Sequence, residues 1–161
     1  MRNILLLFLT LCTSLHALTP TKQLAHAIAK AEGFGASKTN LPTRLHNPGD
    51  IRASRGVHYP GQVGLNKNGY VIFKNDAAGW AALEDQIDRI VAGESRFYSA
   101  SSTLRQMARR YATSPTWVKN VAKNLGVTTG TTLAEILDIP PVVTARSNTH
   151  DLDFILGEDL K

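Results

Sequence analysis

Apolar residues recur at helical spacing in two long stretches of the first half of the chain. The pattern over residues 20–32 opens with Thr19-Pro20, a capping residue followed by proline at the first helical position, and it ends at Gly33. A second amphipathic stripe follows Asp76, which we expect to be its N-cap, and stops near Gly93. Both stretches are predicted to be helices that bury one face.

The second half of the chain predicts three shorter helices, each preceded by residues that suit a helix N-terminus. Their expected positions are residues 104–111 after Ser102 or Thr103, a helix after Ser114-Pro115 that carries Trp117 to Leu125, and a short helix opened by the capping-box spacing of Thr132 and Glu135. The sequence therefore predicts a domain that is mostly helical.

The stretch between the first two helices shows no helical period. Residues 34–60 are interrupted by Pro42 and by Asn47-Pro48-Gly49, so we expect a long loop there. A loop longer than about 15 residues in a compact domain is usually functional. Residues 62–65 and 70–73 are short strand-like runs on either side of a turn, and they predict a small β-hairpin. The predicted fold class is mainly α, as an α+β arrangement of a helical domain with one hairpin.

The first 17 residues have the pattern of a secretory signal peptide, with a basic start, an apolar run from Ile4 to Leu11 and small residues up to Ala17. The apolar run is far shorter than the ~20 residues that cross a bilayer as a helix. We therefore expect an exported protein, periplasmic or secreted, without a stable membrane span after cleavage. The expected organisation is a signal peptide over 1–17, one folded domain over 18–138 and a C-terminal tail over 139–161.

Composition narrows the chemistry that this domain can carry. The chain of 161 residues contains a single cysteine, Cys12, which excludes an internal disulfide framework and a cysteine-rich metal site. Its histidines show no metal-ligand spacing, and phosphate-loop and serine-nucleophile motifs are missing, so we expect neither a metal nor another cofactor. The formal net charge of +5 favours an anionic partner. For an exported chain we expect this partner to be a polymer of the cell envelope rather than nucleic acid. We expect the protein to be a monomer.

Glu32 is the first candidate for a catalytic residue. At about 100° per residue it lies within about 20° of Ala25 and close to Ile28, on the apolar side of the first helix. The helix C-terminus and partial burial both disfavour a carboxylate, so both raise the pKa of Glu32, as a general acid at neutral pH requires. The alternative is a glutamate that reaches solvent or pairs with an arginine. Asp50 in the long loop could supply the second carboxylate of a two-acid glycosidase.

Several motifs together resemble those of a known family. They are Glu32-Gly33-Phe34, the run from Leu41 to Arg52, Tyr70-Val71-Ile72-Phe73, Gly79-Trp80-Ala81-Ala82-Leu83, and Tyr111 with the stretch from Trp117 to Val127. Over residues 20–137 the chain resembles the lysozyme-like lytic transglycosylases among phage and bacterial muramidases. That resemblance implies a mostly helical fold in which the first helix ends in a catalytic glutamate and faces a small hairpin across a sugar-binding cleft.

The resemblance also implies a reaction. In such enzymes one glutamic acid protonates the oxygen between N-acetylmuramic acid and N-acetylglucosamine in peptidoglycan. It then removes the proton of the sugar's own C6 hydroxyl, which leaves a 1,6-anhydro end. Glu32 would be that acid and base, and Asn47 would contact sugar acetamides from the floor of the cleft. Tyr70, Phe73 and Tyr111 would offer aromatic surface or a hydroxyl beside the acid. Core packing is the alternative for each, and for Phe73 we favour it.

The chain departs from the family pattern at two positions. Asparagine is common in the family where this chain has His46 and again where it has Asp50. Because of Asp50, a hydrolytic muramidase is an alternative, in which this carboxylate positions water. His46 could add a pH dependence to the activity. A third possibility, from a different class of protein, is a peptidoglycan-binding or structural protein that keeps the fold without turnover.

Overall fold

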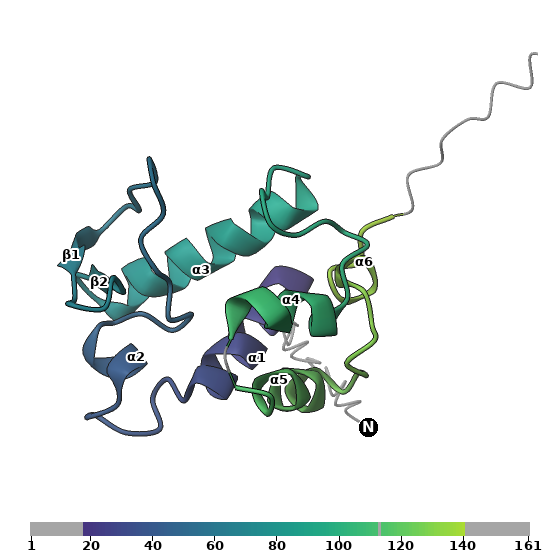
Figure 1. Ribbon diagram of the computed structural model, residues 1–161, viewed down its shortest axis with the longest axis horizontal. Coiled ribbons are helices and arrows are strands. Elements are labelled where there is room, and N and C mark those ends of the chain that lie inside the picture. The colour runs from purple at the N-terminus through teal and green to yellow at the C-terminus, as the bar shows by residue number, and fades with distance from the viewer. Residues whose placement is uncertain (1–17, 113, 141–161) are drawn as a thin grey trace, which may run out of the picture.

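Six helices and one two-stranded antiparallel sheet make up residues 18–112 and 114–140, which are the residues that the computed structural model describes. Their bounds in chain order are α1 Pro20–Glu32, α2 Leu41–Arg44, β1 Gln62–Leu65, β2 Val71–Phe73, α3 Asp76–Val91, α4 Leu104–Tyr111, α5 Trp117–Leu125 and α6 Leu133–Ile136. The mainly α fold with a small hairpin that the sequence predicts is confirmed for this part of the chain (Figure 1).

The first helix, α1, is central to the core. It packs against both α3 and α5, and its residues Leu24, Ala25 and Ile28 are fully buried. The side chain of Thr19 caps its first turn, and Gly33 ends it with φ 79°, a left-handed conformation that glycine adopts without strain. The apolar face predicted from residue spacing is therefore the face that the other helices cover.

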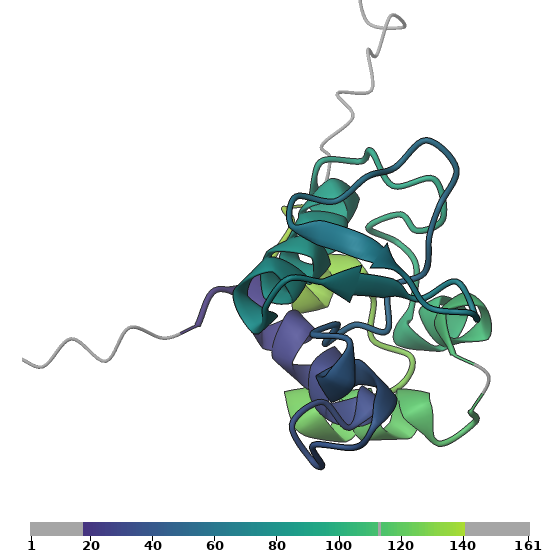
Figure 2. The same cartoon turned by 90° about the vertical axis from the view of Figure 1, so that its left-hand side faces the viewer.

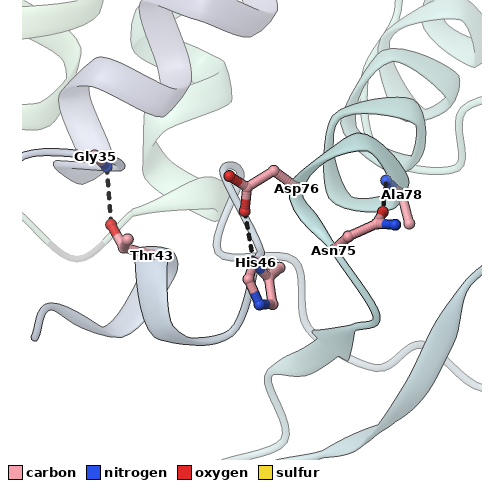
Figure 3. A network of polar contacts seen from close by, with 6 residues as sticks. All are labelled: Gly35, Thr43, His46, Asn75, Asp76 and Ala78. Atoms are coloured by element: carbon pink, nitrogen blue, oxygen red, sulfur yellow. Dashed lines mark hydrogen bonds and ion pairs between the residues drawn. The ribbon is translucent and has the colours of Figure 1, made fainter. Parts of the chain in front are cut away.

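The start of α3 differs from the prediction by one residue. Asn75 is the N-cap instead of Asp76, because its side-chain oxygen accepts a hydrogen bond from Ala78 N at 2.9 Å (Figure 3). Asp76 is the first helical residue, and its Oδ1 lies 2.6 Å from Nδ1 of His46 in the long loop. This carboxylate suits a helix N-terminus and also ties the loop to α3.

The long loop contains a helical turn that periodicity does not reveal. In α2, Pro42 occupies one of the first two positions, where its missing N–H costs no helical hydrogen bond. Thr43 Oγ1 accepts a hydrogen bond from Gly35 N at 2.8 Å, which holds this turn near the end of α1 (Figure 3). A helix of four residues is too short to show a period, and so the sequence predicts only a loop.

The N-termini of the later helices follow the capping signals in part. Thr103 is the N-cap of α4 and Thr132 is the N-cap of α6, each with a complete capping box. Thr103 is one of the two caps predicted for α4, and the capping box of α6 is the predicted one. The predicted cap of α5 is wrong, since this helix begins after Thr116 and makes no side-chain cap hydrogen bond. Its first residue, Trp117, is buried, so packing defines where α5 begins.

Backbone hydrogen bonds attach the long loop to the hairpin. β1 and β2 pair antiparallel, with Leu65 opposite Val71. Val71 N also donates to Ile51 O at 2.9 Å, and Phe73 N donates to Leu45 O at 3.0 Å. Figure 2 views the molecule from the hairpin end, where the two strands run across it. The second half of the long loop is thus part of the same rigid unit as the sheet.

A close contact between this loop and α3 depends on a glycine. A Cβ atom at Gly79 would lie 1.9 Å from the carbonyl oxygen of His46 and 2.8 Å from Cδ of Pro48. Glycine in a helix interior is less favourable than alanine by about 1 kcal/mol. Packing therefore explains why a glycine stands at this position in α3.

Residues 1–17 and 141–161 lie outside the described residues, so the signal peptide and most of the C-terminal tail stay predictions. Within the described ranges, no helix combines the length and the apolar character that crossing a bilayer requires.

We expect Gly79→Ala to lower the free energy of unfolding by about 2–4 kcal/mol, because the added methyl group must push the loop away from α3. Chemical denaturation followed by circular dichroism measures this change. Gly64→Ala is the matched control, since a Cβ there meets nothing closer than 3.9 Å. A Gly79→Ala protein that is as stable as the wild type, or more stable, would contradict the packing argument.

Candidate active site

Glu32 is the last residue of α1 and is partly buried. Its Oε1 accepts a hydrogen bond from Nε1 of Trp117 at 2.7 Å. Behind it, the carbonyl oxygen of Gly33 accepts a hydrogen bond from the side-chain amide of Asn40, which secures the end of the helix. The predicted position of Glu32 on the buried side of the first helix is confirmed.

Aromatic stacking holds Trp117 beside the acid. Trp117 is only 3% exposed, and its ring lies 4.9 Å from that of Tyr111, with 25° between the ring planes. The Tyr111 hydroxyl donates to the carbonyl oxygen of Gly49 at 2.5 Å. A side chain at Gly49 would meet Leu83 at 2.8 Å and this hydroxyl at 3.0 Å. A continuous series of contacts therefore connects the long loop, α4, α5 and Glu32.

Asp50 brings a second carboxyl group to Glu32. The two side chains are close enough that each changes the pKa of the other. Asp50 has φ 45°, in the left-handed region that favours glycine. Its Oδ1 is buried, and no fixed donor among the described residues reaches it. A strained backbone with an unsatisfied carboxyl oxygen is typical of a functional position.

Burial and charge repulsion decide which of the two carries the proton. Burial raises the pKa of Glu32 to about 7, with a further increase from the charge of Asp50 and an opposing effect of the Trp117 hydrogen bond. Burial also raises the pKa of Asp50, while its hydrogen bond with Glu32 and the charge of Arg52 lower it. Because the negative charge of Asp50 is one of the causes that raise the pKa of Glu32, Asp50 loses its proton before Glu32 does.

The carboxyl pair lines a cleft of about 1090 Å³. The walls come from segments that are far apart in the sequence: α1, the loop 49–57, α3, the segment 94–98, α4 and the start of α5. Pockets for small ligands measure about 300–1,000 Å³. This cleft lies at the upper end of that range.

Four of the predicted site residues meet in this cleft, namely Glu32, Asp50, Tyr70 and Tyr111. Tyr70 presents its ring to Arg52, whose guanidinium carbon lies 4.5 Å from the ring centroid. The same guanidinium donates to the Tyr70 hydroxyl at 3.0 Å. The hairpin thus contributes an aromatic side chain to the wall, as the sequence predicts.

Asn47 and Phe73 do not line the cleft, so the predicted ligand contacts of both are wrong, and the core packing favoured for Phe73 is confirmed. Asn47 is fully buried, and its amide nitrogen donates to Ile51 O and Val71 O at 2.9 Å each. Its Oδ1 accepts from Ile51 N at 2.8 Å, which leaves no group for a sugar. Phe73 is 1% exposed and packs edge-on against Tyr59 with centroids 6.1 Å apart. Both residues hold the loop and hairpin in place.

Trp117 and several arginines are site residues that the sequence reasoning missed. The apolar stripe of α5 accounts for Trp117 as a core residue, and a contact with a helix end 85 positions away leaves no local signal. The sequence indicates only that Trp117, if buried, needs a hydrogen-bond partner, because a buried indole N–H usually has one. It does not indicate which residue that partner is. Arg109 and Arg110 of α4, which have no motif around them that indicates a site, also line the cleft.

The chemistry that these side chains support is proton transfer. Glu32 is a protonated acid near neutral pH, and Asp50 is a carboxylate beside it. Across residues 18–112 and 114–140, no group of three or more His, Cys, Asp or Glu side chains is placed to hold a metal ion.

No protein-family model, curated protein or solved structure matches this chain. The functional conclusion therefore depends on the residues and geometry of the site.

The stability of the folded protein should depend on the protonation of Glu32. The pKa of Glu32 is about 7 in the folded protein, against 4.5 for a glutamate in water, so folding favours its protonated form. The stability that this preference contributes is fully present below about pH 4.5 and is lost as the pH rises through about 7. Because the side chain is partly exposed, we expect a loss on the order of 1 kcal/mol.

Thermal unfolding of the wild type and Glu32→Gln at about pH 5 and about pH 8 measures this effect. We expect the wild type to lose about 3–5 °C more in melting temperature than the variant between the two conditions. Glu84→Gln, on α3 and outside the cleft, controls for the removal of a carboxylate. Parallel pH dependence of the wild type and Glu32→Gln would contradict the assigned protonation.

Asn47→Asp should destabilise the fold by at least about 2 kcal/mol, because a carboxylate cannot donate to the carbonyl oxygens of Ile51 and Val71 and is buried without a counter-charge. Urea denaturation gives the difference. Asn68→Asp makes the same substitution at an exposed position of the hairpin turn and should change stability by less than about 0.5 kcal/mol. Equal losses of unfolding free energy in the two variants would contradict the stabilising role of the buried Asn47 amide.

Proposed function

We propose that the protein is an exported peptidoglycan-cleaving enzyme with a lysozyme-like fold, and that it acts as a lytic transglycosylase on the bond between N-acetylmuramic acid and N-acetylglucosamine. The observation that carries this proposal is an acid, Glu32, that keeps its proton up to about pH 7 inside a cleft of about 1090 Å³. A general acid needs a pKa near the pH at which it works. The motif resemblance supports the same residue at the same place, the end of the first helix.

The proposed reaction uses Glu32 twice. Its carboxyl group gives a proton to the glycosidic oxygen, and the bond between that oxygen and C1 of the muramic acid breaks. The resulting carboxylate accepts the proton of the C6 hydroxyl of the same sugar, and the C6 oxygen bonds to C1 to close a 1,6-anhydro ring. No water is consumed, and Glu32 ends the cycle protonated as it began.

Asp50 lines the same cleft as Glu32, and each carboxyl group changes the pKa of the other. In two-acid glycosidases the carboxyl groups flank the sugar at separations of about 5–5.5 Å or about 6.5–9.5 Å, whereas the reaction proposed here needs one acid only. Once Glu32 has lost its proton, the charge of Asp50 makes Glu32 a stronger base, which suits the second step.

The aromatic neighbours have separate roles in this proposal. Trp117 positions the acid, since its N–H holds Oε1 of Glu32. Tyr111 supports Trp117 by stacking, and its hydroxyl is engaged by Gly49 O rather than free for a sugar. Tyr70 is the aromatic side chain of the hairpin that lines the cleft, where its ring and hydroxyl contact Arg52.

We expect the purified protein to release soluble fragments with 1,6-anhydro ends from isolated peptidoglycan, and Glu32→Gln to lower the rate at least about a hundredfold. Mass spectrometry separates anhydro ends from hydrated ends, because they differ by one water. Glu84→Gln is the matched control, since it removes a carboxylate outside the cleft and should retain activity.

Two other outcomes would replace the proposal. Hydrated fragments that disappear in Glu32→Gln would keep Glu32 as the acid but make water the acceptor, as in a hydrolytic muramidase that uses Asp50. Binding to peptidoglycan by the wild type without any soluble fragment would indicate a non-catalytic binding protein.

A further inference from the structure

Arginine side chains gather along the cleft. Six of them line it, whereas no lysine of the described residues does: Arg52, Arg55, Arg89, Arg96, Arg109 and Arg110. Three carboxyl groups line the same space, and two of these, Glu32 and Asp50, interact with each other. The cleft therefore holds positive charge that its own acidic residues do not neutralise.

Most of these guanidinium groups have no carboxylate partner in the described part of the chain. Arg89 pairs with Asp85 at 2.9 Å, and the other five form no ion pair with a described residue. A guanidinium presents its N–H donors in one plane and binds a carboxylate through two parallel hydrogen bonds, which an ammonium group cannot do. The use of arginine without lysine thus favours a ligand that carries carboxylates.

Two of the arginines are oriented by aromatic rings. The guanidinium carbon of Arg52 lies 4.5 Å from the centroid of Tyr70, and that of Arg110 lies 4.3 Å from the centroid of Phe97. Stacking covers one face of the guanidinium and leaves N–H groups at its edge free to bind. This contact also gives a role to Phe97, which is 51% exposed.

Arg52 and Arg110 belong to two different walls around the acid. Arg52 follows Asp50 by two residues and pairs with the hairpin through Tyr70. Arg110 directly precedes Tyr111, whose ring stacks on the tryptophan that holds Glu32. A glycan strand cleaved at Glu32 would carry substituents of its sugars past both walls. In peptidoglycan these substituents are short peptides on muramic acid, and their free carboxylates match the arginines.

We propose that Arg52 and Arg110 bind carboxylates of the peptides on the glycan strand, so that peptide-bearing strands are the preferred substrate. This inference rests on the proposed function, because it concerns recognition of the same strand in the same cleft. Peptide-free strands offer another carboxylate, that of the muramic acid lactyl group, and the experiment separates these two sources.

The readout is binding in a Glu32→Gln background, so that no ligand is cleaved. Isothermal titration calorimetry compares three tetrasaccharides of alternating N-acetylglucosamine and N-acetylmuramic acid. The first carries peptides with free carboxylates, the second carries the same peptides with their carboxyl groups converted to amides, and the third has no peptide and a free lactyl carboxylate. We expect the first to bind about tenfold more tightly than the other two.

Paired variants test the two arginines directly. Arg52→Gln with Arg110→Gln should abolish the preference for the first ligand, and Arg52→Lys with Arg110→Lys should restore it only in part, because an ammonium group lacks the planar fork. Lys67→Gln with Lys119→Gln removes the same charge outside the cleft and should keep the full preference. Melting curves establish that each variant is folded.

The outcomes separate this inference from the function on which it rests. Equal binding of the first two ligands, or a preference that survives the paired Arg→Gln change, would overturn the role of the arginines and leave the proposed function standing. Equal binding of the first and third ligands would assign the carboxylate to the lactyl group and overturn the preference for peptide. If none of the tetrasaccharides binds, the proposed function itself fails.

Discussion

The buried side-chain amide of Asn47 is the interaction on which the geometry of the site depends. It donates to Ile51 O and Val71 O and accepts from Ile51 N, so one side chain closes the loop and joins it to β2. Only a group that donates and accepts at once can make these bonds, which excludes a carboxylate or an apolar side chain of similar size. Because the loop is closed in this way, Asp50 is held in its left-handed conformation and Gly49 lies under Tyr111.

The two carboxyl groups are thus positioned by two separate elements. Glu32 lies at the end of α1, and Asp50 lies in the loop that the Asn47 hydrogen bonds close. Neither position is favourable for folding, since both pKa values are raised by burial and a raised carboxyl pKa means lost stability wherever the group is ionised. The apolar contacts of α1 with α3 and α5, together with the close fit of the loop at Gly79, offset that loss. Strain at a functional site persists when its surroundings hold it in this way.

The parts of the structure that the sequence predicts are those with a local signal. Helical spacing and caps recover α1, and the same spacing places Glu32 on the buried side. Strand-like runs on either side of a turn recover the hairpin. The cap of α3 is one residue off because Asn75 and Asp76 both suit an N-cap. Asn47 and Phe73 are wrong as ligand contacts because a motif does not show which way a side chain faces. The hydrogen bond between Trp117 and Glu32 joins distant segments, so only the fold reveals it.

The cleft meets two electrostatic demands that oppose each other. Positive charge attracts an anionic strand, but positive charge beside Glu32 would lower its pKa and release the proton that the reaction needs. Burial is the largest cause of the raised pKa of Glu32, and the charge of Asp50 adds to it. The charge of Arg52 lowers the pKa of Asp50 and so favours the negative charge that acts on Glu32. Burial and Asp50 together therefore let a basic cleft retain a protonated acid.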